Sequence, residues 1–171
     1  MTEEEKVTLV PTSSMDLDKQ VLILRAYVVL TNMGTQPVHY KRVVSMTRVA
    51  RSQASGVNAF FIGLGFLRRV DKGTYLPAKE LVEFYSETPG EENFLALTSL
   101  LRQSALFETV KNLLRVHGHA TEKEVIEYLL EESGEKTESR ARRALDWLEK
   151  ARLIKIDADK HLQILEESRM E

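Results

Sequence analysis

The sequence contains no cysteine and no long apolar run. Without cysteine the chain can form neither disulfides nor thiolate metal sites, and it has no cysteine nucleophile. No stretch approaches the roughly 18 apolar residues of a membrane span. The first residues are acidic and polar, where a secretory signal would be basic and then apolar. We therefore expect a cytoplasmic protein.

Motifs typical of enzymes are also missing from the sequence. There is no Walker-type loop, no nucleophile elbow and no spaced carboxylate pair. Gly63 and Gly65 lack the third glycine and the preceding strand of a dinucleotide fingerprint. His117 and His119 have no cysteine or paired acidic motif to complete a metal site, and a helix C-terminus favours histidine through its dipole. We expect no enzymatic activity, no metal and no cofactor.

Charge is present in quantity and is unevenly distributed. Residues 1–18 hold five acids and one base, residues 19–86 hold three acids and ten bases, and residues 87–171 hold eighteen acids and thirteen bases. The middle part therefore carries a net charge of +7 between parts of −4 and −5. This asymmetry indicates an acidic or nucleic-acid partner for the basic part, with ordinary scatter between small domains as the alternative.

Residues 18–86 predict three helices and a hairpin. The segment from Asp18 to Gly34 is typical of a long, mostly buried helix, and Pro37 lies near the start of a short second helix. Apolar residues with helical spacing follow in "RSQASGVNAFFIGLG", with Ser52 or the preceding turn as N-cap. Then "FLRRV", "DKG" and "TYLP" predict a strand, a turn and a return strand.

The second half of the chain repeats this plan. "SALFETVKNLLRVHG" and "ATEKEVIEYLLEESG" predict two helices, the latter opening with a capping box of Thr121 and Glu124. "KTESRARRALDWLEKA" predicts a third helix, and "RLIKIDADKHLQIL" predicts a hairpin. Phe66-Leu67 and Leu153-Ile154 occupy matching places 87 residues apart, which favours an internal duplication.

These patterns divide the chain into four parts. Residues 1–17 are expected to be poorly ordered or to form a short strand through Val7, Leu9 and Val10. Residues 18–86 form the first unit, residues 87–104 a linking helix, and residues 105–166 the second unit. The apolar stripe of the linking region packs either between the units or against a second copy, and it consists of Phe94, Leu97, Leu100 and Leu101.

The order of three helices and a hairpin, found twice, resembles the winged helix-turn-helix superfamily. The tandem form is similar to uncharacterised two-domain archaeal and bacterial members. The resemblance covers about residues 19–165 and rests on patterns of apolar residues and turns. It implies a mainly α fold with small β-hairpin wings, a third helix that enters the major groove, a wing that contacts the DNA backbone or minor groove, and frequent dimers.

The resemblance places candidate DNA-binding residues on the first unit. Arginine suits guanine, glutamine and asparagine suit adenine, and serine suits phosphate, while the basic side chains around the helix suit backbone contacts. The alternative is that serine and glutamine serve helix capping, and that basic strands are solvated edges. The candidates are Lys41, Arg42, Arg48, Arg51, Ser52, Gln53, Ser55, Asn58, Arg68, Arg69 and Lys72.

The second unit has a different charge pattern. Its third helix carries Arg140, Arg142 and Arg143, but a dense acidic run precedes it and would repel phosphate. We therefore expect this unit to serve protein contact, dimerisation or inhibition. The resulting hypothesis is a transcription-regulator-like protein that binds double-stranded DNA through its first unit. We expect a homodimer, because helical DNA readers usually need two half-sites. The alternatives are a protein-interaction adaptor and an RNA-binding or DNA-maintenance component.

Overall fold

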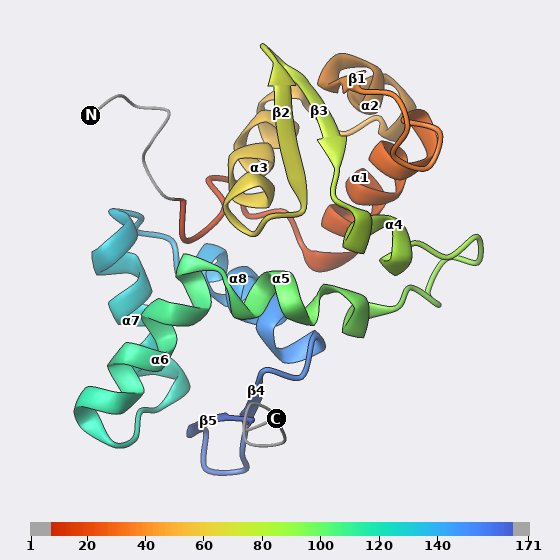
Figure 1. Ribbon diagram of the computed structural model, residues 1–171. Coiled ribbons are helices and arrows are strands. Elements are labelled where there is room, and N and C mark those ends of the chain that lie inside the picture. The colour runs from red at the N-terminus through yellow and green to blue at the C-terminus, as the bar shows by residue number, and fades with distance from the viewer. Residues whose placement is uncertain (1–7, 166–171) are drawn as a thin grey trace.

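A computed structural model describes residues 8–165, which fold mainly into helices with two small antiparallel sheets. The upper part of Figure 1 holds the first unit, in which three helices pack around a sheet of three strands in the order β1-β3-β2. The elements of this unit are α1 (Leu17–Leu30), β1 (Val38–His39), α2 (Tyr40–Thr47), α3 (Arg51–Gly63), β2 (Leu67–Asp71) and β3 (Thr74–Pro77).

The first unit has one strand more than the sequence predicts. The predicted hairpin is present as β2 and β3, but β1 lies between the first two helices and pairs with β3 through Val38 and Tyr75. Because this strand has two residues, no period-2 pattern could reveal it. Pro37 precedes this strand and is not part of the second helix, which begins at Tyr40.

The helix ends follow ordinary capping chemistry. Asp16 accepts a hydrogen bond from the backbone N–H of Lys19 and so caps α1, which begins at Leu17, one residue before the predicted start at Asp18. Beyond α3, Gly65 adopts a left-handed conformation with φ of 83°, which turns the chain from the helix into β2. The inward-facing apolar residues of α1 and α3 are buried, as the sequence predicts, while Leu22, Val29 and Ile62 on the outer sides are exposed.

The second unit occupies the lower part of Figure 1 and has the same element order. Thr121 forms an isolated bridge with His161 at the place where the first unit has β1. The predicted capping box of Thr121 and Glu124 is confirmed, since each side chain accepts a hydrogen bond from the other residue's backbone N–H. The elements are α6 (Ala105–His117), α7 (Glu122–Ser133), α8 (Glu138–Lys150), β4 (Ile154–Ile156) and β5 (Leu162–Ile164).

Backbone hydrogen bonds repeat between the two units at the same spacing as the sequence pairs. Ala78 donates to the carbonyl of Phe66, and Leu165, 87 positions further on, donates to Leu153 at the same distance of 2.9 Å. The left-handed Gly65 is matched by Arg152, also left-handed with φ of 60°. The predicted duplication therefore extends to the backbone geometry at the start and end of each hairpin.

The linking region is folded into the seam between the units. Of the predicted linking helix over residues 87–104, only the 3₁₀ helix η2 (Phe94–Leu97) and α5 (Thr98–Arg102) are helical, and α4 (Lys79–Phe84) ends the first unit. Leu97 and Leu101 are completely buried, and Leu100 packs partly buried against the same core. Of the two uses that the sequence allowed for this stripe, packing within the chain is the one observed.

Trp147 of α8 lies at the centre of the seam. Its indole ring contacts four aromatic rings, and its N–H donates to Oε1 of Gln20 on α1 at 2.7 Å. The ring centroids lie at 6.4 Å from Phe61, 5.1 Å from Phe66, 6.3 Å from Phe84 and 5.8 Å from Phe94. The two units therefore share one continuous core.

The segment of residues 8–16 also belongs to this seam. It forms no strand, but Val10 and Met15 are buried and the chain runs along α3, with Thr8 against Gly63 and Thr12 against Gly56. The prediction of a poorly ordered or strand-forming segment is thus wrong for the part that the structure describes. Residues 1–7, including Val7, lie outside the described residues.

Candidate nucleic-acid interface

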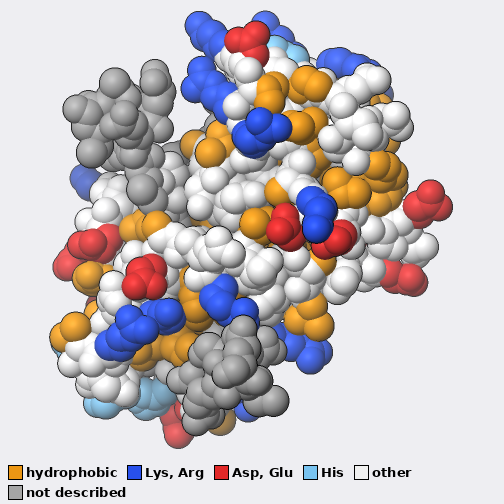
Figure 2. Space-filling view, viewed as in Figure 1, with side chains coloured by type: hydrophobic (Ala, Val, Ile, Leu, Met, Phe, Trp, Pro, Cys, Tyr) orange, Lys and Arg blue, Asp and Glu red, His pale blue; other side chains and the backbone are white. Residues whose placement is uncertain are grey.

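Seven basic side chains surround α3 in the first unit, and all of them are exposed. In Figure 2, Lys and Arg side chains gather in the upper part of the view, where Figure 1 places the β2–β3 hairpin and α2. We call these residues the basic end; it consists of Lys41 and Arg42 on α2, Arg48 in the turn after α2, Arg51 on α3, and Arg68, Arg69 and Lys72 on the hairpin.

The start of α2 is joined directly to the hairpin turn. The backbone N–H of Tyr40 donates to the carbonyl of Gly73 at 2.9 Å, and a Cβ added to Gly73 would lie 2.6 Å from Nε2 of His39. His39 also caps α2, because its Nδ1 accepts from the N–H of Lys41. The basic residues of α2 and of the hairpin are therefore held on neighbouring pieces of backbone, an arrangement that β1 creates and that the sequence analysis missed.

None of the seven basic side chains forms an ion pair with an acidic residue within residues 8–165. Asp71 is the one acid in the hairpin, and its carboxylate accepts from the backbone N–H of Lys72. The basic end therefore keeps its positive charge available to an external anion.

The N-terminus of α3 adds further donors beside this charge. Of the two predicted N-caps, Ser52 or the preceding turn, the structure has the latter: the N-cap residue is Ala50, which has no side-chain acceptor. Arg48 precedes it in a left-handed conformation with φ of 61°, and Arg51 is the first helical residue. Free N–H groups at a helix start, together with the helix dipole, favour a phosphate or carboxylate at this position.

The exposed face of α3 is polar only in its first half. Arg51, Ser52 and Ser55 are exposed and Gln53 is half-buried, so these candidates lie at the surface. Further along, the exposed positions are Ala59, Ile62 and Gly63, none of which has a polar side chain. The exposed polar side chains of α3 are thus concentrated in its first two turns.

Asn58 is a correction to the predicted surface. The residue is 2% exposed, and its Oδ1 accepts a hydrogen bond from the hydroxyl of Tyr27 at 3.0 Å. Burial raises the pKa of the Tyr27 hydroxyl, which therefore stays protonated and able to donate. Asn58 is a buried hydrogen-bonding partner, since a polar residue at a core position satisfies a buried tyrosine.

The two arginines of β2 face opposite sides of the sheet, because successive side chains alternate along a strand. Arg69 lies opposite Tyr75 of β3, and Tyr75 packs edge-on against Tyr27 with ring centroids 6.0 Å apart. Burial raises the pKa of the Tyr75 hydroxyl, and the charge of Arg69 acts in the opposite direction. Arg68 lies opposite Leu76, and its side chain therefore belongs to the other face of the sheet. A single phosphate cannot contact both side chains from one side.

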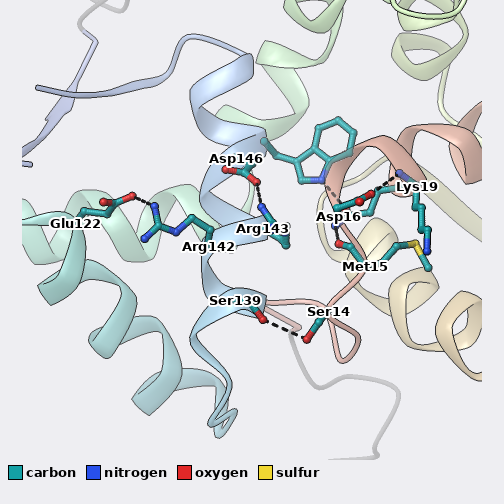
Figure 3. Close-up of polar contacts among 11 residues, drawn as sticks. Ser14, Met15, Asp16, Lys19, Glu122, Ser139, Arg142, Arg143 and Asp146 are labelled. Atoms are coloured by element: carbon teal, nitrogen blue, oxygen red, sulfur yellow. Dashed lines mark hydrogen bonds and ion pairs between the residues drawn. The ribbon is translucent and has the colours of Figure 1, made fainter.

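The equivalent helix of the second unit has its arginines neutralised. Figure 3 shows Arg142 reaching Glu122 on α7 and Arg143 reaching Asp146 on α8 itself, the latter at 3.0 Å. Arg140 pairs with Glu135 at 2.6 Å. The second unit therefore presents paired arginines beside an acidic α7, where the first unit presents unpaired ones.

The histidines of the second unit lie near the end of α6 and in the β4–β5 hairpin. His119 lies beside His161, with ring centroids 6.1 Å apart, while His117 belongs to the last turn of α6. No group of three histidine or acidic side chains within residues 8–165 is arranged to hold a metal ion. No helix of the described residues is long and apolar enough to cross a membrane.

Comparison of the chain with protein-family models, with curated proteins and with solved structures found no match.

Proposed function

We propose that the chain is a double-stranded DNA-binding protein of the transcription-regulator type, built from two winged helix-turn-helix units, of which the first contacts DNA. The observation that carries the proposal is the basic end: seven exposed and unpaired basic side chains around the start of α3. The order of elements, the same in both units, supports the winged-helix assignment: a helix, a short strand or bridge, two helices and a two-stranded hairpin.

The chemistry of the basic end suits a duplex with phosphates on either side of a groove. Arg51, Ser52 and Gln53 on the first turn of α3 would face base edges, where arginine pairs with guanine and glutamine with adenine. Basic residues of α2 and of the hairpin flank this turn and would contact phosphates, which position a protein without reading sequence. Phosphate contacts alone supply most of the non-specific affinity.

A protein-interaction adaptor is the second candidate, and the second half of α3 favours it. Ile62 is 38% exposed and Ala59 lies one turn before it, so this part of the helix offers an apolar surface where a DNA reader would carry polar groups. In an adaptor, the basic end would meet an acidic protein surface. RNA binding remains a third use of the same basic surface.

A homodimer is proposed on symmetry alone, because DNA readers with one reading helix per chain use two half-sites about one turn apart. The linking stripe does not support it, since Leu97 and Leu101 are buried within the chain.

Paired substitutions test the proposal. Replacing Arg68 and Arg69 with alanine removes two bases from the hairpin, and replacing Lys123 and Lys155 removes two exposed bases from the second unit, with Lys155 at the position equivalent to Arg68. Fluorescence anisotropy with a labelled duplex measures affinity at several salt concentrations. We expect R68A/R69A to flatten the slope of log affinity against log salt by about two units, and K123A/K155A to leave it unchanged. Equal effects of the two double variants would contradict a DNA surface on the first unit.

A further inference from the structure

We infer that one chain engages a single segment of DNA groove through its first unit, and that the second unit braces α3 and does not enter a second groove. This inference rests on the proposed function and specifies its ligand: a short duplex segment of one half-site. The two helices at issue are α3 and its equivalent α8, both of which end in the seam between the units.

The distance between α3 and α8 is too small for two successive grooves. Phe61 of α3 and Trp147 of α8 have ring centroids 6.4 Å apart. Nearer the start of α8, Ser139 contacts Ser14, and Thr12, two residues before Ser14, lies against Gly56 of α3. The two helices therefore stay close along their lengths, whereas half-sites on one face of DNA lie about 34 Å apart. Both helices therefore cannot read the same face of one duplex.

The two helices cannot share one groove either. The major groove is about 12 Å wide and admits a single helix. In addition, the space beside α3 on the side toward α8 is filled by residues 8–16: Thr12 lies against Gly56 of α3, and the hydroxyl of Ser14 lies 3.2 Å from that of Ser139 on α8. Figure 3 shows this contact between Ser14 and Ser139.

The spacing is fixed by polar contacts as well as by the aromatic core. Gln20 accepts from the indole of Trp147 and donates to the carbonyl of Met15 at 3.0 Å, which ties α1, α8 and the N-terminal segment together. Thr98 of α5 donates to the carbonyl of Ala151 at the end of α8. Gln20 and Trp147 are fully buried and Thr98 is half-buried, so a hinge that separated the two units would break these contacts.

The length of duplex that a chain needs for full affinity distinguishes contact with one groove segment from contact with two. Anisotropy titrations with duplexes of about 12, 16 and 24 base pairs report affinity, corrected for the number of binding registers, and sedimentation reports how many chains bind each duplex. We expect the corrected affinity of one chain to be reached by the duplex of about 12 base pairs, and longer duplexes to bind further chains. A gain of more than about tenfold between the 12 and 24 base-pair duplexes, in complexes that sedimentation shows to hold a single chain, would overturn the inference, whereas a gain confined to complexes of two chains reports the proposed homodimer.

A matched pair of arginine variants gives a second readout. Arg51→Ala removes an exposed arginine from α3, and Arg142→Ala removes an exposed arginine from α8. We expect R51A to weaken binding about fivefold or more, and R142A to leave affinity within about twofold of the parent. Loss of affinity in R142A comparable to that in R51A, with unchanged far-UV circular dichroism, would contradict the inference alone. Absence of binding to every duplex would remove both the proposed function and this inference.

Discussion

Replacing Trp147 with alanine should destabilise both units together. The indole is completely buried, contacts four aromatic rings and donates to Gln20, which lies on the other unit. Truncation of a buried tryptophan costs about 3–5 kcal/mol through lost contacts and the remaining cavity. The unpaired amide of Gln20 adds to this, so we expect a loss of about 4–6 kcal/mol in the free energy of unfolding.

Urea denaturation followed by far-UV circular dichroism measures this loss. Trp147→Phe retains an aromatic ring and removes the hydrogen bond, so a smaller loss of about 1–3 kcal/mol is expected from the buried amide. Val116→Ala is the control, because Val116 is 78% exposed and its truncation should change stability by no more than about 0.5 kcal/mol. The parent should unfold in one transition. A loss below about 1 kcal/mol in W147A, or separate transitions for the two units in the parent, would refute the single shared core.

Three further predictions follow from the described contacts. Tyr27→Phe should lower the free energy of unfolding by about 1–3 kcal/mol, because the buried Asn58 loses its hydrogen-bond donor. The double variant Y27F/N58L should recover most of that loss in urea denaturation, and no recovery would count against the buried pair. The carboxylates of Glu124 and Asp157 accept backbone hydrogen bonds, from Thr121 and from His161 respectively, and these hold their pKa values below the ordinary range. Their stabilisation is therefore present above the unfolded pKa and is lost as pH falls through the lower folded pKa, so E124Q/D157N should flatten the acid side of the thermal-midpoint profile, and an unchanged profile would contradict this. Light scattering at tens of micromolar protein should show the proposed homodimer, and monomer alone would exclude it at that concentration.

The repeated helices and hairpins could be predicted from the sequence because each carries its own local signal. Apolar spacing marks α3 and α8, the capping box marks α7, and the "DKG" turn marks the hairpin of the first unit. The buried core residues follow from the same spacing. The similarity of the two units was visible in the sequence as a repeat at a spacing of 87 residues. The matching backbone hydrogen bonds extend this similarity to the structure.

What the sequence could not show depends on contacts between distant residues. β1 has two residues, and its pairing with β3 is set by tertiary position. Asn58 has the chemistry of a reading residue, and only the location of the Tyr27 hydroxyl shows that it is buried. The polar segment of residues 8–16 is held in place by α3 and α8, neither of which adjoins it in the sequence. The sequence therefore predicted the basic residues of the candidate site, but not that Asn58 lies outside it or that β1 joins α2 to the hairpin.

The salt dependence of duplex binding tests the proposed function most directly. If the basic end neutralises about five phosphates, the logarithm of the affinity should fall against the logarithm of salt concentration with a slope of about −4 to −5. Fluorescence anisotropy with the full chain and a labelled duplex of about 24 base pairs measures this slope. A slope in that range supports binding through the basic end, whereas no measurable binding at about 50 mM salt would contradict the DNA-binding proposal.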